Sequence, residues 1–286
     1  MSGTSYSLDE LPKFSVWPRR LLGIEPWTTR NKTPAEVLRE YEVDKWGDLL
    51  TKLGRGEITS LAQADRLFYA PDIRLPSCIG DDLLLLDMQE AHRRYLALLE
   101  SVLDSLLPCT ALVELGAGYG SQILALAKQP AFADAAIFAG EYTASGVTLI
   151  KAFAAREKVS IVAERCDFNG DPLAILPVPE NAIIFTSMAT HYVPMLSSKF
   201  FDSLCARRPK AVIHLEPCHE HCASDTLLGL MRRRYIEVND YNTNLVSLAH
   251  QLAAQGRLEI LSERPQLMGQ NVLLPVSLLV WRPSLR

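Results

Sequence analysis

The sequence predicts an α/β fold in which a seven-stranded sheet, with its last strand antiparallel, follows an N-terminal helical extension. From residue 110 onward, short apolar runs alternate with helical patterns, which is typical of a parallel sheet covered on both faces. Two strand-like runs near the C-terminal end are separated by a short connection, and short connections make antiparallel hairpins. We therefore expect a helical extension or lid over residues 1–86 and the main domain over residues 87–286.

The N-terminal part is expected to be mainly helical. A capping box begins at Thr33, with proline at the first helical position, and apolar residues then recur at helical spacing as far as Gly54. A short helix is expected after Ser60, and a longer one over residues 87–107, where apolar residues again share one helical face.

The main domain contains seven runs that predict strands. Five of them alternate with helical patterns, at 111–115, 135–141, 160–166, 182–187 and 210–217, and two follow at 257–266 and 271–283. In an open α/β sheet, ligands bind beyond the carboxyl ends of the parallel strands. The residues that follow these runs are therefore the first candidates for a binding site.

The amino-acid composition indicates which kinds of partner the protein is not expected to bind. The chain of 286 residues has 48% hydrophobic residues, which is enough for a sizeable core, and a formal net charge of -4. No basic run is longer than Arg232–Arg234, so no nucleic-acid partner is expected. No apolar run reaches the roughly 18 residues of a membrane span, and no signal peptide is evident, so we expect a cytoplasmic protein with reduced cysteines and no membrane partner.

The stretch VELGAGYGSQ at residues 113–122 places three glycines directly after the first strand of the main domain. A dinucleotide fingerprint needs its third glycine one residue later, and the lysine of a phosphate-binding loop is absent. Glu114 stands two residues before the first glycine, where a carboxylate would repel a pyrophosphate and attract a cation. The loop therefore favours a ligand that carries positive charge.

Residues 114–120 resemble the first motif, E/D-x-G-x-G-x-G, of the class I S-adenosylmethionine-dependent methyltransferases, a Rossmann-like superfamily. The resemblance extends over about residues 87–286. It implies S-adenosylmethionine as cofactor, with S-adenosylhomocysteine as product, and a methyltransferase activity. The cofactor contacts that it implies in this motif are those of Glu114, Gly116, Gly118 and Gly120.

The same resemblance assigns further cofactor contacts at the ends of the next strands. Glu141, with Tyr142 after it, stands where the family has the acidic residue that binds the ribose hydroxyls, and a carboxylate suits two vicinal hydroxyl donors. Asp167 and Phe168 match the pair that meets the adenine, and Ser187 matches the loop that passes the methionine moiety.

Structural roles are the alternatives for three of these residues. Asp167 is equally suited to a turn before Asn169-Gly170, Phe168 to the core, and Glu114 to anchoring its own loop through backbone hydrogen bonds.

The candidate catalytic residues follow the fourth and fifth strands of the main domain. His191, His214 and Glu216 are groups that could position or deprotonate a methyl acceptor. The neighbouring cluster Cys218–Cys222 has donors that suit a metal, but they are crowded into one segment, so we expect no metal site. A polar loop that caps the next helix is the structural alternative for this cluster.

Hydrogen-bonding groups beside aromatic rings suggest the acceptor site. The residues expected to contact the substrate are Tyr192, His219, Tyr241, Asn242 and Asn244, with an exposed helix and turn as the alternative for the last three. Trp17, Trp27, Tyr41 and Trp46 are candidates for a lid over the same cleft, or for the core or a contact between two copies of the chain in a homodimer.

The function expected from these residues is methyl transfer to the nitrogen or oxygen of a small molecule, for example a secondary metabolite. A protein or peptide methyltransferase, or a non-catalytic protein that binds the cofactor, is the alternative. The sequence does not identify the acceptor.

Overall fold

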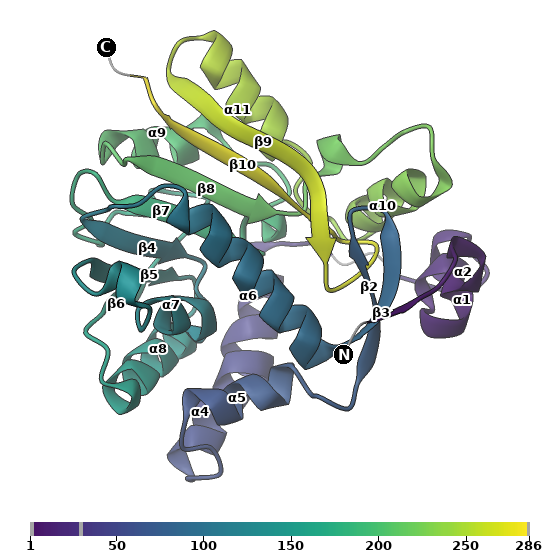
Figure 1. Cartoon of the computed structure of the whole chain (residues 1–286), viewed down its shortest axis with the longest axis horizontal. Helices are drawn as coiled ribbons and strands as arrows, with labels where there is room; N and C mark the ends of the chain where they lie inside the picture. The colour runs from purple at the N-terminus through teal and green to yellow at the C-terminus, as the bar shows by residue number, and fades with distance from the viewer. Residues whose placement is uncertain (1–2, 29–30, 285–286) are drawn as a thin grey trace.

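The computed structural model describes residues 3–28 and 31–284. These residues form one sheet of ten strands in the order β1-β3-β2-β9-β10-β8-β7-β4-β5-β6 (Figure 1). The strands are β1 Thr4–Ser5, β2 Arg74–Ile79, β3 Asp82–Asp87, β4 Ala111–Leu115, β5 Ala136–Glu141, β6 Val162–Arg165, β7 Ile183–Ser187, β8 Ala211–Glu216, β9 Leu258–Gly269 and β10 Val276–Pro283.

Helices cover both faces of this sheet, and Figure 1 shows α6 lying across the face turned toward the viewer. The α-helices are α1 Leu11–Phe14, α2 Trp17–Leu21, α3 Pro34–Leu38, α4 Trp46–Gly54, α5 Leu61–Phe68, α6 Met88–Asp104, α7 Ser121–Leu126, α8 Ala144–Glu157, α9 Ser198–Ala206, α10 Leu227–Val238 and α11 Leu245–Ala254. A π-helix, η2, spans Arg39–Lys45, and short 3-10 helices are η1 Leu8–Glu10, η3 Pro130–Phe132, η4 Thr190–Tyr192 and η5 His219–His221.

The seven strands of the main domain lie close to their predicted positions. Strands β4 to β8 pair in parallel, and β10 lies antiparallel between β8 and β9, which confirms the antiparallel last strand. The predicted total of seven strands is wrong, because β1, β2 and β3 of the N-terminal part extend the same sheet.

The additional strands join the sheet through the long strand β9. A two-residue turn at Gly80 and Asp81 joins β2 to β3, with Gly80 at φ +58° as such tight hairpin turns require. Strand β9 extends beyond its pairing with β10, and its last residues pair with Cys78 and Ile79 of β2. The N-terminal part is therefore less purely helical than its sequence predicts.

The predicted N-terminal helices are present. The Thr33 hydroxyl accepts the Glu36 N–H at 3.2 Å and begins α3, as the capping box predicts. The expected continuous helix from there to Gly54 is divided, because α3 and α4 are joined by the seven-residue π-helix η2. Helices α5 and α6 match the other two predictions.

The core lies in two apolar layers, one on each face of the sheet. Along β4, Leu112 faces the layer formed with α6, α7 and α8, whereas Val113 faces the layer formed with α9 and α11. This alternation follows from the two-residue period of a strand. Both faces of β4, β7 and β8 are buried, and apolar residues predominate in their sequences.

None of the helices in the described ranges is long and apolar enough to cross a membrane.

Candidate functional site

A cavity of about 330 Å³ opens beyond the carboxyl ends of β4, β5 and β7. This volume lies within the range of about 300–1,000 Å³ that is usual for small-molecule pockets. The glycine loop after β4 forms part of its lining, and residues 32–46 of the N-terminal part form another. The cavity thus joins the predicted cofactor site to the predicted lid.

The structure brings eight of the nine predicted cofactor residues to this cavity. They are Glu114, Gly116, Gly118, Glu141, Tyr142, Asp167, Phe168 and Ser187. Gly120 is the exception, because a side chain there would meet Ile150 at 3.1 Å inside the core rather than a ligand. Its φ of +89° at the start of α7 explains the need for glycine.

The glycine loop is held close to the neighbouring strand by backbone hydrogen bonds. The N–H groups of Gly116 and Ala117 donate to the Gly140 carbonyl at 2.8 and 3.0 Å. Gly116 has φ +80°, and a β-carbon there would come within 2.3 Å of the Ala189 side chain. The loop backbone therefore requires glycine for its conformation and for its close approach to the segment after β7.

Glu141 connects the end of β5 to the glycine loop. Its Oε2 accepts the Gly118 N–H at 2.9 Å, and its Oε1 accepts both the N–H and the hydroxyl of Thr143. Burial raises the pKa of Glu141 more than these hydrogen bonds lower it. A carboxylate has about four acceptor positions, so Oε2 retains capacity for a hydroxyl donor of a ligand.

Glu114 lines the same cavity from the end of β4. Its Oε2 accepts the Ile123 N–H at 3.0 Å, which supports its predicted role as an anchor of the loop and of α7. Burial, with a contribution from the charge of Glu141, holds the pKa of Glu114 well above its usual range. A cation placed in the cavity would favour the ionised form of both carboxyl groups.

Asp167 and Phe168 each combine a structural contact with a place in the cavity lining. Asp167 Oδ1 accepts the Asn169 N–H at 2.9 Å, which is the predicted turn contact. The Phe168 ring packs edge-on against Phe200 with the ring centres 5.5 Å apart. Asp167 therefore forms the turn and Phe168 packs on the core, and both residues also line the cavity.

Two buried polar atoms of the lining have no hydrogen-bond partner among the described residues. They are the indole Nε1 of Trp46, a donor, and the amide Oε1 of Gln122, an acceptor. Buried polar groups are normally paired, because desolvation without a partner is costly. An unpaired donor and an unpaired acceptor beside the glycine loop fit a bound group with the mixed polarity of an amino acid.

Part of the lid prediction is supported by the cavity lining. Tyr41 and Trp46 line the cavity, and the Trp46 ring contacts the rings of Phe68 and Tyr119 at 5.5 and 5.2 Å. Trp17 does not line it, and packs against Trp27 and Tyr235 elsewhere.

Lys32 and Lys45 also line the cavity, and the sequence analysis missed them. The spacing of Val37, Tyr41 and Lys45 places Lys45 on one helical face with two other lining residues, but it does not show that this face meets the cavity, and Lys32 lies outside this helical pattern.

Two carboxylates attach the N-terminal part to the loops of the cavity. Glu42 accepts the N–H groups of Ala144 and Ser145 at 2.6 and 3.1 Å, and so adds negative charge to the N-terminus of α8. Asp65 accepts the hydroxyls of Tyr119 and Ser121, both at 2.7 Å. The N-terminal part therefore contacts the loops after both β4 and β5.

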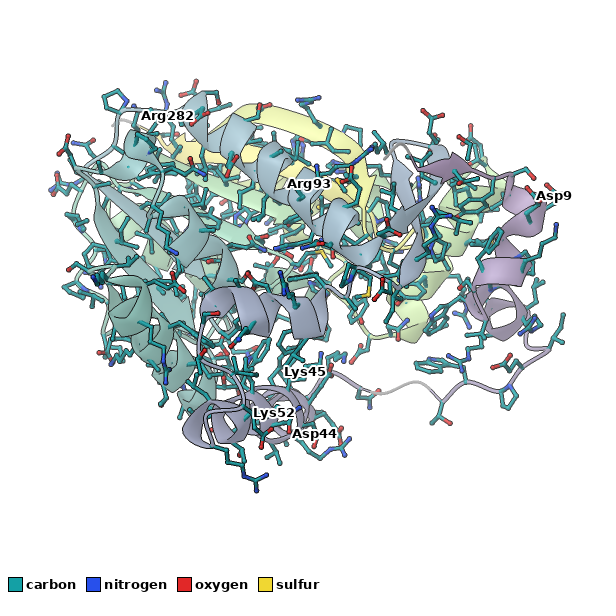
Figure 2. All side chains as sticks on the ribbon, turned by 60° about the horizontal axis from the view of Figure 1, so that its bottom comes forward. Asp9, Asp44, Lys45, Lys52, Arg93 and Arg282 are labelled. Atoms are coloured by element: carbon teal, nitrogen blue, oxygen red, sulfur yellow. The ribbon has the colours of Figure 1, made fainter. Side chains whose placement is uncertain are left out.

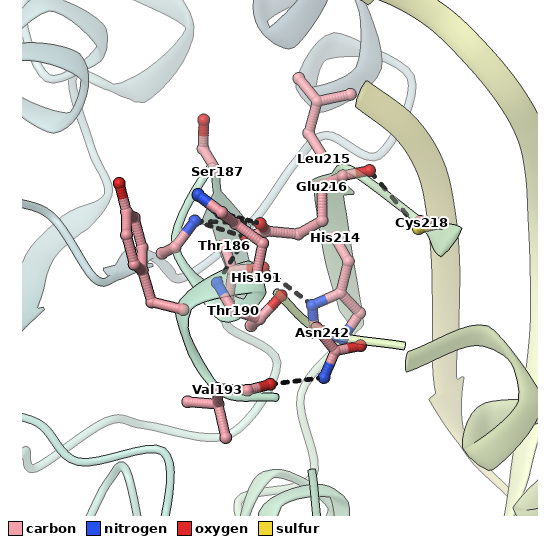
Figure 3. A network of polar contacts seen from close by, with 12 residues as sticks. Thr186, Ser187, Thr190, His191, Val193, His214, Leu215, Glu216, Cys218 and Asn242 are labelled. Atoms are coloured by element: carbon pink, nitrogen blue, oxygen red, sulfur yellow. Dashed lines mark hydrogen bonds and ion pairs between the residues drawn. The ribbon is translucent and has the colours of Figure 1, made fainter. Parts of the chain in front are cut away.

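Glu216 is fully buried at the end of β8 and lies outside the cavity lining. Its carboxylate accepts the N–H groups of Ala189 and Thr190 at 2.9 and 3.1 Å, and lies 3.5 Å from Nδ1 of His191 (Figure 3). Burial raises the pKa of Glu216, but the hydrogen bonds from His191 and from the two backbone N–H groups outweigh it and leave the pKa below its usual value. Glu216 thus positions the turn after β7.

The two candidate histidines also lie behind the cavity wall. His191 is 2% exposed, and its ring packs against Tyr192 at 4.2 Å. His214 is fully buried, with Nδ1 2.9 Å from the Thr186 hydroxyl and Nε2 accepting the Trp281 N–H at 3.0 Å. Burial lowers the pKa of His214 to about 4. The structure brings neither histidine into the cavity lining.

Among the predicted substrate residues, Tyr192 alone lines the cavity. Asn242 donates to the Val193 carbonyl at 2.7 Å, and Asn244 exchanges two hydrogen bonds with the Leu196 backbone at 2.9 Å. These amides therefore hold one loop against another. The Tyr241 ring lies behind Tyr192, with the ring centres 5.6 Å apart.

The loop after β8 has structural contacts of its own. His219 lies on η5 beside Glu237, with the two side chains 3.2 Å apart. Across residues 3–28 and 31–284, no three His, Cys, Asp or Glu side chains are grouped to hold a metal ion.

No protein-family model and no curated protein matches the chain. Among solved structures, it is similar to geranyl diphosphate C-methyltransferase from Streptomyces coelicolor A3(2), in complex with Mg2+, geranyl diphosphate and S-adenosyl-L-homocysteine. The identity is 13%, the TM-score is 0.51, and the match covers 68% of this chain and 82% of that one.

A second structure of that enzyme, with geranyl-S-thiolodiphosphate, has a TM-score of 0.50 at 12% identity, over 68% of this chain and 78% of that one. Magnesium protoporphyrin IX methyltransferase from Synechocystis PCC 6803, with bound SAM, matches 88% of this chain and 98% of its own at 12% identity and a TM-score of 0.49. The chain has the fold of the class I S-adenosylmethionine-dependent methyltransferases.

Proposed function

We propose that the protein is an S-adenosylmethionine-dependent methyltransferase that acts on a nitrogen or oxygen atom of a small molecule. The observation that carries the proposal is that one cavity combines the glycine loop and Glu141 with the aromatic side chains of the N-terminal part. The cofactor end and the acceptor end would thus share one cavity, as direct transfer of a group between two ligands requires.

The cofactor supplies a methyl group on a positively charged sulfur. Glu141 would accept hydroxyl hydrogen bonds of its ribose, and Phe168 would pack on its adenine. Trp46 Nε1 and Gln122 Oε1 would pair with the carboxylate and the ammonium of its amino-acid part, which resolves their lack of partners. The raised pKa values of Glu114 and Glu141 suit a site that gains a positive charge on binding.

The cover that the N-terminal part forms over the cavity favours a small acceptor over a protein. A folded protein substrate would need an open groove, whereas residues 32–46 cover this cavity and are attached through Glu42 to α8. A non-catalytic role in cofactor binding is the second candidate, and the observation that favours it is that none of the predicted catalytic side chains lines the cavity. Catalysis stays the first candidate, because methyl transfer can proceed by proximity and orientation alone.

Isothermal titration calorimetry with S-adenosylmethionine, S-adenosylhomocysteine and NAD tests the cofactor assignment. We expect binding of the first two and none of NAD. Tight binding of NAD would contradict the proposal. Incubation of the protein with methyl-labelled cofactor and a metabolite extract then tests for turnover, because binding without any labelled product would support the non-catalytic role.

A further inference from the structure

Two lysines give one end of the cavity an excess of positive charge. Lys32 and Lys45 both line the cavity, and the Nζ atoms of both pair with the same carboxylate, that of Glu40, at 3.1 and 2.9 Å. Within the two described ranges, no other carboxylate lies within ion-pair distance of either ammonium group. At the ammonium groups themselves, one carboxylate between two charges leaves one positive charge without an ion-pair partner, while the nearby Asp240 carboxylate accepts the Lys32 backbone N–H at 2.6 Å.

The ammonium groups have donors available for a further anion. Each has three N–H donors, of which Glu40 accepts one. Lys45 lies over the Tyr41 ring at 4.1 Å, and Lys32 over the Tyr192 ring at 4.8 Å, so aromatic faces hold both side chains in place. The side chain of Lys32 is only 11% exposed, which strengthens its interaction with an anion.

The surroundings of these lysines suit an apolar or aromatic body. Val37, Met188, Val193 and Pro194 line the cavity together with the two tyrosines. An acceptor that fits this end therefore combines an apolar part with a negative charge. A cationic amine would meet the unneutralised positive charge instead.

The carboxylate at this end of the cavity is a poor acceptor for a proton, because burial raises the pKa of Glu40 but Lys45 and Lys32 outweigh this effect and lower the pKa. No histidine of the described residues lines the cavity, and Glu216 lies behind it, held by backbone N–H groups. Tyr41 donates to the Tyr192 hydroxyl, and burial raises the pKa of both phenols well above the usual value. Alcohols, phenols and protonated amines need a group that takes their proton, whereas a carboxylate is already ionised at neutral pH.

We propose that the methyl acceptor is the carboxylate of a small apolar or aromatic acid, held by Lys32 and Lys45 and converted into a methyl ester. The inference rests on the proposed function and specifies its acceptor. A lone pair of one carboxylate oxygen forms the bond to the methyl carbon while the carbon–sulfur bond breaks. The electron pair of that bond remains on sulfur, which becomes neutral, and no proton is released.

The alkali lability of the transferred methyl group tests this inference. The protein is incubated with methyl-labelled S-adenosylmethionine and a metabolite extract of the source organism, and the products are treated with mild alkali. We expect labelled methanol, because alkali hydrolyses a methyl ester but not an N-methyl or ether group. Label that stays bound after alkali would overturn the carboxylate acceptor and leave the proposed methyltransferase intact. No label in any product would overturn both.

Lysine variants locate the anion. The acid whose methyl ester carries the label serves as substrate for the variants. We expect Lys32→Met and Lys45→Met each to raise the KM for this acid about tenfold to hundredfold, because each removes a charged hydrogen bond. Lys52→Met is the matched control, since Lys52 lies on the same helical segment as Lys45 but pairs with Asp48 outside the cavity lining (Figure 2). The carboxylate of the cofactor is another anion that these lysines could hold. A loss of S-adenosylhomocysteine affinity with an unchanged acceptor KM would assign the lysines to the cofactor and overturn the inference.

Discussion

The indole ring of Trp46 lies directly against Gly118. A β-carbon built on Gly118 would come within 3.0 Å of the Trp46 ring, and Gly118 itself has φ +58°. Trp46, the first residue of α4, therefore packs on the middle glycine of the loop after β4. The N-terminal part and the glycine loop form one packed unit, which makes both sensitive to substitution at this glycine.

Gly118→Val should abolish binding of S-adenosylhomocysteine while the protein remains folded. Valine at positive φ costs about 1–2 kcal/mol, and its methyl groups would also meet Trp46 and fill the ligand space. Gly56→Val is the matched control, because Gly56 has φ +74° and no atom within 4 Å of an added β-carbon. Calorimetry and urea denaturation check both variants. Equal affinity in the two would show that Gly118 is needed only for backbone conformation.

Glu141→Ala should lower the affinity for S-adenosylhomocysteine by roughly ten- to hundredfold. The substitution removes a hydrogen bond of about 1.5–3 kcal/mol to the ligand, and also the support that Glu141 gives to the Gly118 N–H. Glu164→Ala, on the adjacent strand β6 and paired with Lys151, is the control and should bind normally. Calorimetry measures both variants. Unchanged affinity in Glu141→Ala would remove this residue from the site.

Glu216→Gln should raise the acceptor KM by about tenfold without changing the pH dependence of kcat/KM. The variant loses the charge that holds the N–H groups of Ala189 and Thr190, so the turn after β7 loosens. Steady-state rates between pH 4 and 9 check this. Glu263→Gln, a part-buried carboxylate bound to His221 and His250, is the control. A general base must be deprotonated to act, so loss of the acidic limb of the profile in Glu216→Gln alone would make the residue a base and the positioning role wrong.

The free energy of unfolding of the free protein should contain a contribution from Glu114 that falls as pH rises. Because burial raises the pKa of Glu114 in the folded state, its contribution is fully present below the ordinary pKa of 4.5 and is lost as pH rises toward the raised value. Glu114→Gln cannot ionise and should show a smaller loss between pH 5 and pH 8. Urea denaturation at four pH values checks the slope. Glu164→Gln, at a part-exposed carboxylate, should keep the wild-type slope, and an unchanged slope in Glu114→Gln would contradict the prediction.

The sequence predicts the sheet of the main domain well because its central strands β4, β7 and β8 are buried on both faces. Runs such as 111–115 and 182–187 are almost wholly apolar, and this pattern leaves little choice of structure. The hairpin of β2 and β3 was not predicted. Strand β2 pairs on one side with β3 and on the other with the end of β9, which lies about 190 residues further along the chain. A contact between segments so far apart leaves no local pattern in the sequence.

The sequence predicts those residues of the candidate site whose role depends only on their near neighbours in the chain. Gly116 and Gly118 are needed by a loop whose conformation is fixed within a few residues, so their pattern identifies them. Asn242 and Asn244 have the same polar character as ligand contacts, yet they bind the loop beside them. Lys32 and Lys45 reach the cavity because distant helices pack there, and no spacing in the sequence reports that packing.

The π-helix η2 determines which side chains of residues 34–46 face the cavity. Its hydrogen bonds join each residue to the fifth one along, so η2 holds more residues per turn than the α-helices on either side. The wider turns of η2 accommodate one extra residue, so its deletion would restore a regular α-helix while α3 and α4 kept nearly their present orientation. The side chains within η2 itself, Tyr41 and Lys45 among them, would shift instead. A lineage could therefore alter the lining of the cavity through a change in chain length here, with no substitution at any residue that contacts the ligand.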